Sequence, residues 1–174
     1  MRRHIWHGLS ENIWINLLWF QLLWWLSILQ TDSARWPVLI LLIVHLLMHR
    51  HLFTEALVIT ACGCVGFVVD SILTLLGFFR FSPDHVLPPF WLFLLWLGFA
   101  ATLRQGLKYF VGRWYLAMTS GAVAGAATYF AAAELGAVTL GWSDIESLLL
   151  LATIWALMFP GLLWLSHSLG RRYV

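Results

Sequence analysis

Six long apolar runs, separated by short polar segments, constrain the fold of this chain more than any other feature. Hydrophobic residues make up 61% of its 174 residues and charged residues only 10%. A soluble domain typically has about 45–50% apolar and about 25% charged residues. The chain therefore lacks the polar side chains needed to cover a water-exposed surface, and we predict an all-α, polytopic membrane protein.

The apolar runs have the lengths expected of membrane-spanning helices, because a bilayer core of about 30 Å takes roughly 20 helical residues. Short connections make consecutive helices antiparallel neighbours, so residues 1–174 are predicted to form a single six-helix membrane domain. The segment SDIE, Ser143 to Glu146, predicts a capping box at the start of the last helix. The predicted spans are 13–30, 37–49, 56–79, 89–108, 114–135 and 147–167.

The basic residues indicate the orientation of these spans. With the N-terminus in the cytoplasm, eight of the ten Lys and Arg residues fall on the inner side, and only Arg35 and Arg80 fall outside. Such an excess is typical of cytoplasmic loops, so both termini are predicted to be cytoplasmic. The inner set is Arg2, Arg3, Arg50, Arg104, Lys108, Arg113, Arg171 and Arg172.

One carboxylate, Asp70, lies inside the third run, in the segment ACGCVGFVVDSILTLLGFF. At about 100° per residue it shares one helical stripe with Gly63, Gly66, Thr74 and Gly77. Glycines let another helix approach closely, and acids within a membrane usually face the bundle interior. We therefore predict that Asp70 faces a close-packed neighbour in the outer half of the membrane.

The role and the partner of Asp70 stay open at this point. It is either a buried acid that holds helices together or a substrate or proton site, because intramembrane acids commonly mark functional sites. The residues at a suitable depth or reach to contact it are Ser27, Gln30, Arg35, Arg80, Thr128 and Tyr129. The fifth run, rich in Gly and Ala, is predicted to be a central helix with neighbours on several sides.

Tryptophans deep in the predicted spans allow two interpretations. They are either bulky packing and lipid-contact residues or an aromatic lining for a long hydrophobic ligand. Arg104 and Lys108 share a helix face near the inner surface, where they would either contact an anionic group or only set the topology. The deep tryptophans are Trp19, Trp24, Trp25, Trp96 and Trp155. The candidate ligand-binding residues are Asp70, Ser71, Thr74, Trp96, Arg104 and Thr128.

Histidines gather on the predicted inner side. His45 and His49 share a helix face, and the segment HLLMHRH resembles in outline a histidine box of membrane desaturases and hydroxylases. The sequence has no HH pair, however, and no carboxylate shares their turn, although Glu55 is nearby. We therefore predict no metal and no cofactor, with His45 and His49 as the weaker metal candidates, and interpret them as membrane-surface residues.

Signatures of soluble-type catalysis and of nucleic-acid binding are missing from the sequence. It contains no GxSxG motif, P-loop or dinucleotide fingerprint. Basic runs interleaved with exposed aromatics, which would indicate nucleic-acid binding, are also missing. We assign no catalytic residue and no nucleic-acid partner, and leave open whether the protein is an enzyme.

Four apolar segments cover much of the chain: NLLWFQLLWW, GFVVDSILTLLGFF, PPFWLFLLWLGFAATL and GAVAGAATYFAAAELGAV. In these segments the chain resembles a family of small proteobacterial inner-membrane proteins catalogued only as a domain of unknown function. The resemblance implies a multi-helix bundle in the bacterial inner (plasma) membrane. It implies no activity, substrate or catalytic residue.

We therefore expect a membrane protein that binds or passes a lipid-like hydrophobic small molecule, or helps a partner membrane protein to do so. Asp70 would be its buried polar centre, between the third and fifth runs. The alternatives are a membrane-embedded enzyme that modifies lipid, using Asp70 or the inner histidines, and a structural subunit of a membrane complex.

Overall fold

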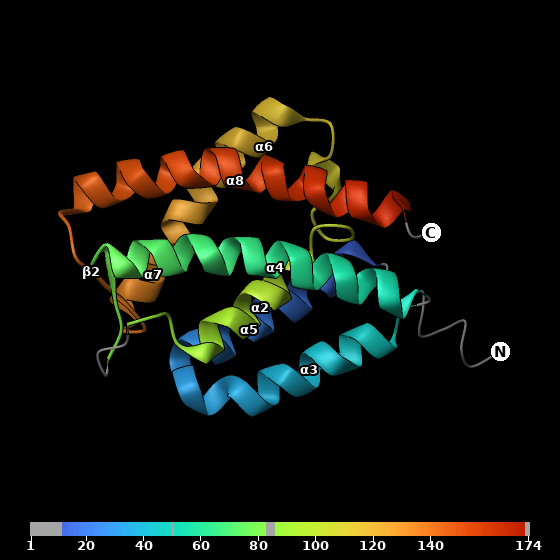
Figure 1. Ribbon diagram of the computed structural model, residues 1–174, viewed down its shortest axis with the longest axis horizontal. Coiled ribbons are helices and arrows are strands. Elements are labelled where there is room, and N and C mark those ends of the chain that lie inside the picture. Colours follow the sequence, from blue (N-terminus) through green and yellow to red (C-terminus); the bar gives the residue numbers. More distant parts are fainter. Residues whose placement is uncertain (1–11, 50, 83–85, 173–174) are drawn as a thin grey trace.

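The computed structural model describes residues 12–49, 51–82 and 86–172, and Figure 1 shows their arrangement. The predicted all-α class is confirmed, with one two-residue strand pair added. Several residues on which the sequence analysis depends lie outside these ranges: Arg2, Arg3, His4, His7, Arg50 and Asp84. The elements are α2 (Ile13–Gln30), η1 (Thr31–Ala34), α3 (Arg35–Leu47), α4 (Leu52–Leu75), β1 (Phe79–Arg80), α5 (Phe90–Ala100), η2 (Lys108–Phe110), α6 (Trp114–Ser120), the π-helical η3 (Gly121–Gly125), α7 (Ala126–Glu134), β2 (Thr139–Leu140) and α8 (Asp144–Arg172).

Among the described residues, four helical segments are long and apolar enough to cross a membrane, so this is a multi-pass membrane protein. They are Ile13–Leu47, Leu52–Leu75, Trp114–Glu134 and Asp144–Arg171. The first contains two arms, because the chain turns back at η1 and α3 returns beside α2 (Figure 1). The 13 residues of α3 and the 11 of α5 extend only about 20 Å and 17 Å, at 1.5 Å per residue.

The helix α5 lies at the centre of the bundle. Seven of its 11 residues are buried, and it contacts α2, α3 and α4. A helix that is apolar on every face is expected in such a position. The prediction of a central fifth run is wrong: the continuous run Trp114–Glu134 packs mainly on α8, and Ala124, Ala127 and Thr128 on it are exposed.

The helix α5 also ends earlier than predicted, at Ala100 rather than near Lys108. The side chain of Asn16, buried in α2, explains this end. Its amide nitrogen donates to the carbonyl of Ala101 at 3.3 Å, and its oxygen accepts the backbone N–H of Gly106 at 3.1 Å. These two bonds satisfy backbone groups that a turn would otherwise leave unpaired inside the bundle. The residues from Ala101 to Leu107 consequently form successive turns.

The helices α4 and α7 end in the same way and are joined there. Gly77 and Gly136 have φ angles of 74° and 78°, a left-handed conformation that favours glycine after a helix end. The N–H of Phe78 reaches the carbonyl of Leu73, as in a Schellman motif. The strands β1 and β2 that follow pair antiparallel, Phe79 with Leu140 and Arg80 with Thr139. This pair ties the ends of α4 and α7 together.

The start of α8 shows one of the two bonds of the predicted capping box, from the Ser143 N–H to the Glu146 carboxylate. The Ser143 hydroxyl donates to the Glu146 carboxylate at 2.6 Å, and the Ser143 N–H donates to the same oxygen at 3.2 Å. The helix nevertheless begins at Asp144 and continues to Arg172, several residues beyond the predicted 147–167 at its C-terminal end.

Replacing Asn16 with Leu should destabilise the protein, because Ala101 and Gly106 each lose a buried hydrogen bond. The loss should be about 1–3 kcal/mol, seen as a drop of several degrees in the apparent melting temperature in detergent. Gln30→Leu is the matched control, since Gln30 is an exposed polar residue of the same helix. Equal melting temperatures for the two variants would contradict this account of the α5 end.

Candidate functional site

The contact between α4 and α5 begins at Gly66. A Cβ atom on Gly66 would lie 2.2 Å from the ring of Trp96, so the indole occupies the space that a side chain would need. Gly63, one turn earlier, faces Leu97 in the same manner. The prediction that this stripe faces a close-packed neighbour is confirmed for Gly63 and Gly66, and the neighbour is α5. It is wrong for Gly77, which lies beyond the end of α4 and has nothing within 4 Å of its Cβ position.

Asp70 lies one turn beyond Gly66 on the same face and is 1% exposed. The indole nitrogen of Trp96 donates to its Oδ2 at 2.7 Å. The hydroxyl of Tyr129, from α7, is 2.8 Å from both carboxylate oxygens and donates to the carboxylate. A buried acid is tolerated when its oxygens have such donors. Asp70 thus joins α4 to both α5 and α7.

Trp96 and Tyr129 also line a groove on the flank of the bundle, with a volume of about 660 Å³. Its floor consists of buried residues of α5 and α8, among them Trp91, Leu95 and Trp155. Its rim consists of exposed residues near the middle of α2 and of the run Trp114–Glu134, such as Trp25 and Ala127. These rim residues lie within apolar segments long enough to span a membrane.

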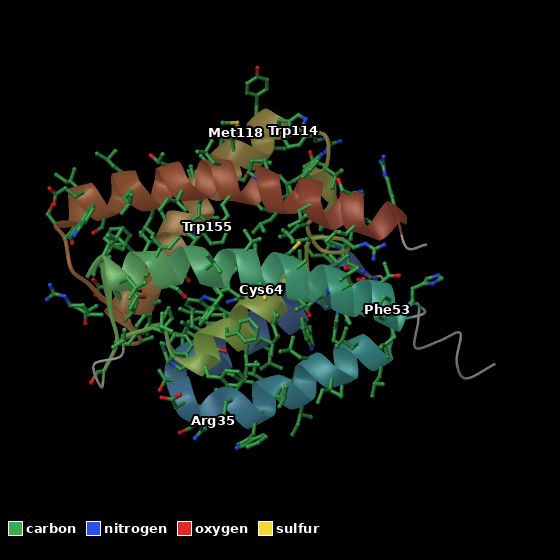
Figure 2. The ribbon with its side chains drawn as sticks, in the orientation of Figure 1. Arg35, Phe53, Cys64, Trp114, Met118 and Trp155 are labelled. Atoms are coloured by element: carbon green, nitrogen blue, oxygen red, sulfur yellow. The ribbon has the colours of Figure 1, made fainter. Side chains whose placement is uncertain are left out.

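Aromatic rings make the floor of the groove rigid. Trp96 stacks on Trp155 with centroids 5.5 Å apart, and Phe99 meets Trp155 edge-on at 5.4 Å. Figure 2 shows Trp155 within the bundle, while Trp114 and Met118 lie on α6 at the outer edge. The ring of Trp155 occupies the space that a Cβ on Gly125 would need, at 2.2 Å. This contact brings the π-helical segment close to α8, and π-helical turns recur at functional sites.

The predicted ligand-binding residues separate into three groups. Trp96 and Thr128 line the groove. Asp70 lies behind it, bonded to two lining residues, and Ser71 and Thr74 donate to carbonyls one turn earlier in α4. Arg104 lies elsewhere, beside Glu55. The ligand-binding role of each residue stays a prediction.

Four of the five deep tryptophans line the groove: Trp24, Trp25, Trp96 and Trp155. The fifth, Trp19, instead stacks on His45 with ring centroids 4.5 Å apart. The indole N–H of Trp24 is buried and has no hydrogen-bond partner among the described residues. Among the described residues it is the one groove-lining indole whose N–H is fully buried without an acceptor.

A second polar cluster lies where α3 ends and α4 begins. The Nε2 atoms of His45 and His49 are 3.2 Å apart, and His49 Nε2 is 3.7 Å from Glu55 Oε1. The other oxygen of Glu55 accepts a bond from Arg104 at 2.9 Å. His45 and Glu55 are buried, with 5% and 4% exposed surface. Within the described ranges, these two histidines and Glu55 are the residues grouped closely enough to hold a metal ion.

Sequence reasoning missed two features of these sites. It weighed Tyr129 as a partner of Asp70 without finding that Trp96 is the second donor. The signal was present, because Gly66 and Asp70, four residues apart on one face, leave room for a large side chain that carries a donor. It also rejected Glu55 as a metal ligand beside the two histidines, because Glu55 does not share their helical turn.

The fold defines a helical, multi-pass membrane protein, and the side of its bundle carries an aromatic-lined groove. The family model described as "Protein of unknown function (DUF2878)" matches residues 13–161. The chain belongs to this family. No curated protein and no solved structure matches the chain.

Replacing Asp70 with Asn should destabilise the bundle by about 1–3 kcal/mol, because an amide offers one acceptor oxygen where Trp96 and Tyr129 both donate. The readouts are the melting temperature in detergent and the indole N–H resonance of Trp96 in an NMR spectrum. Glu134→Gln, at an exposed acid, is the control. An unchanged melting temperature together with an unchanged Trp96 resonance would show that the carboxylate does not hold the indole.

Proposed function

We propose that the protein binds or passes a lipid-like hydrophobic small molecule in the groove between α2 and the run Trp114–Glu134. The observation that carries the proposal is the groove itself: an apolar, aromatic-lined space of about 660 Å³ whose rim lies within membrane-spanning segments. Small-molecule sites typically enclose about 300–1,000 Å³ and are lined mainly by apolar and aromatic side chains.

The polar groups around the groove indicate what the ligand carries. The indole N–H of Trp24 has no partner among the described residues but is itself buried, so the ring would have to turn before it could donate to an ester or carboxyl oxygen of an otherwise apolar molecule. The hydroxyl of Tyr129 and the indole N–H of Trp96 are already engaged by Asp70. Asp70 is thus a positioning residue that fixes two walls of the groove, and it does not line the groove itself.

The topology belongs to the same proposal: six membrane passes in the bacterial inner membrane, with both termini cytoplasmic. Alternating helix directions support it, because the start of α2 and the end of α8 lie at the same end of the molecule (Figure 1). Arg104, Lys108 and Arg171 would then lie inside, and Arg35 and Arg80 outside. The short α3 and α5 would cross with the help of the turns that flank them.

Filling the groove tests the binding proposal. Ala127→Phe places a ring at an exposed, groove-lining position, whereas Val123→Phe adds the same ring to an exposed position that does not line the groove. A fluorescent long-chain fatty acid should bind the Ala127→Phe variant at least about tenfold more weakly, a loss of about 1.4 kcal/mol. Val123→Phe should bind like the wild type.

Native mass spectrometry of gently extracted protein provides the second readout. A co-purifying lipid-like molecule should be retained by the wild type and by Val123→Phe, and lost from Ala127→Phe. Equal retention and equal fatty-acid affinity in all three proteins would refute binding in this groove.

Cysteine labelling in intact cells tests the topology. Val86 and Lys108 are exposed and lie at opposite ends of α5 and its following turns. A cysteine at Val86 should react with a membrane-impermeant maleimide, and a cysteine at Lys108 should react only after the cells are lysed. The reverse pattern would place the termini outside, and labelling of both positions in intact cells would exclude a crossing between them.

A further inference from the structure

The turn between α3 and α4 brings together three side chains that the sequence keeps apart. Glu55 lies ten positions after His45, and no helical turn contains both. In the folded protein one ligand atom from each of His45, His49 and Glu55 lies within 4.8 Å of the other two. The carboxylate that the sequence pattern lacked is therefore supplied by the first turns of the next helix.

The spacing of these atoms suits a shared metal ion. Nitrogen ligands bind Zn²⁺ at about 2.0–2.1 Å, so two of them around a tetrahedral ion lie about 3.3 Å apart. The Nε2 atoms of His45 and His49 are 3.2 Å apart, and Glu55 Oε1 is 3.7 Å from His49 Nε2. To share an ion, Glu55 Oε1 would have to come closer to both histidines than it is here. Two histidines and one carboxylate on one side of an ion leave its other positions open.

Neighbouring groups hold these three side chains in place. The ring of His45 stacks on Trp19, which fixes its orientation. Arg104 binds Glu55 Oε2 at 2.9 Å and leaves Oε1 facing His49. Contacts of this kind, which orient the ligands without touching the ion, typically accompany metal sites.

We propose that His45, His49 and Glu55 bind one first-row divalent transition-metal ion at the junction of α3 and α4. The site is independent of the aromatic groove and of any ligand bound there. The same distances also suit a metal-free arrangement in which one histidine donates to the other and Glu55 binds only Arg104. The experiment must separate these two arrangements.

The test uses the full-length protein, purified in detergent through an affinity tag without histidines and then loaded with Zn²⁺ or Co²⁺. The wild type should retain one ion per chain by elemental analysis, show the visible absorption of Co²⁺ bound to protein, and melt at a higher temperature with Zn²⁺. His49→Gln and Glu55→Gln should lose all three effects.

Two controls isolate the proposed ligands. His51→Gln removes an exposed histidine just beyond the pair and should keep the ion. Arg104→Gln removes the side chain that orients Glu55 but no ligand, so it should bind the ion more weakly without losing it. Substoichiometric zinc in the loaded wild type, or unchanged binding by His49→Gln, would overturn the proposal.

X-ray absorption of the zinc-loaded wild type keeps the proposal testable even where the variants do not fold. Imidazole scattering with nitrogen neighbours at about 2.0–2.1 Å would support the assignment. A spectrum without imidazole scattering would overturn it.

Discussion

The indole of Trp96 is held at two places on α4, and much of the interior depends on this arrangement. Its ring fills the space above Gly66, and its N–H donates to Asp70 one turn further on. Tyr129 brings α7 to the same carboxylate. In a medium without water, each of these donors and acceptors would be costly to leave unpaired. Three helices are therefore fixed relative to one another by a single carboxylate, and the groove floor is fixed with them.

The two polar centres of the molecule lie at opposite ends of α4. Glu55 and Asp70 are 15 residues apart in one helix, or about 22 Å. Asp70 accepts hydrogen bonds from side chains inside the bundle and supports the apolar lining of the groove. Glu55 lies among groups that bind cations or carry positive charge, close to the helix ends. One helix thus carries two different kinds of chemistry, one near each of its ends.

The sequence predicted those features that depend on local periodicity and composition. The all-α class, the bounds of the first helix, the capping bond from the Ser143 N–H to Glu146 and the packed face of Asp70 all follow from such patterns, and the structure agrees. The features that it could not predict depend on contacts between distant segments. The end of α5 is determined by Asn16, which lies more than 80 positions earlier in the chain. No sequence pattern around Ala100 predicts that the helix ends there. The proximity of Glu55 to His45 and His49 likewise depends on the turn between two helices.

Because the groove lies on the flank of the bundle rather than at its ends, the binding affinity of the proposed ligand has to be expressed relative to the surrounding lipid. A molecule that enters from the bilayer arrives by diffusion in two dimensions, and its occupancy depends on its mole fraction among the surrounding lipids. Extraction into excess detergent dilutes that lipid phase and would lower the occupancy of the groove, even where the contacts with its lining are unchanged. The groove would therefore respond to membrane composition itself, filling as its ligand becomes a larger share of the bilayer.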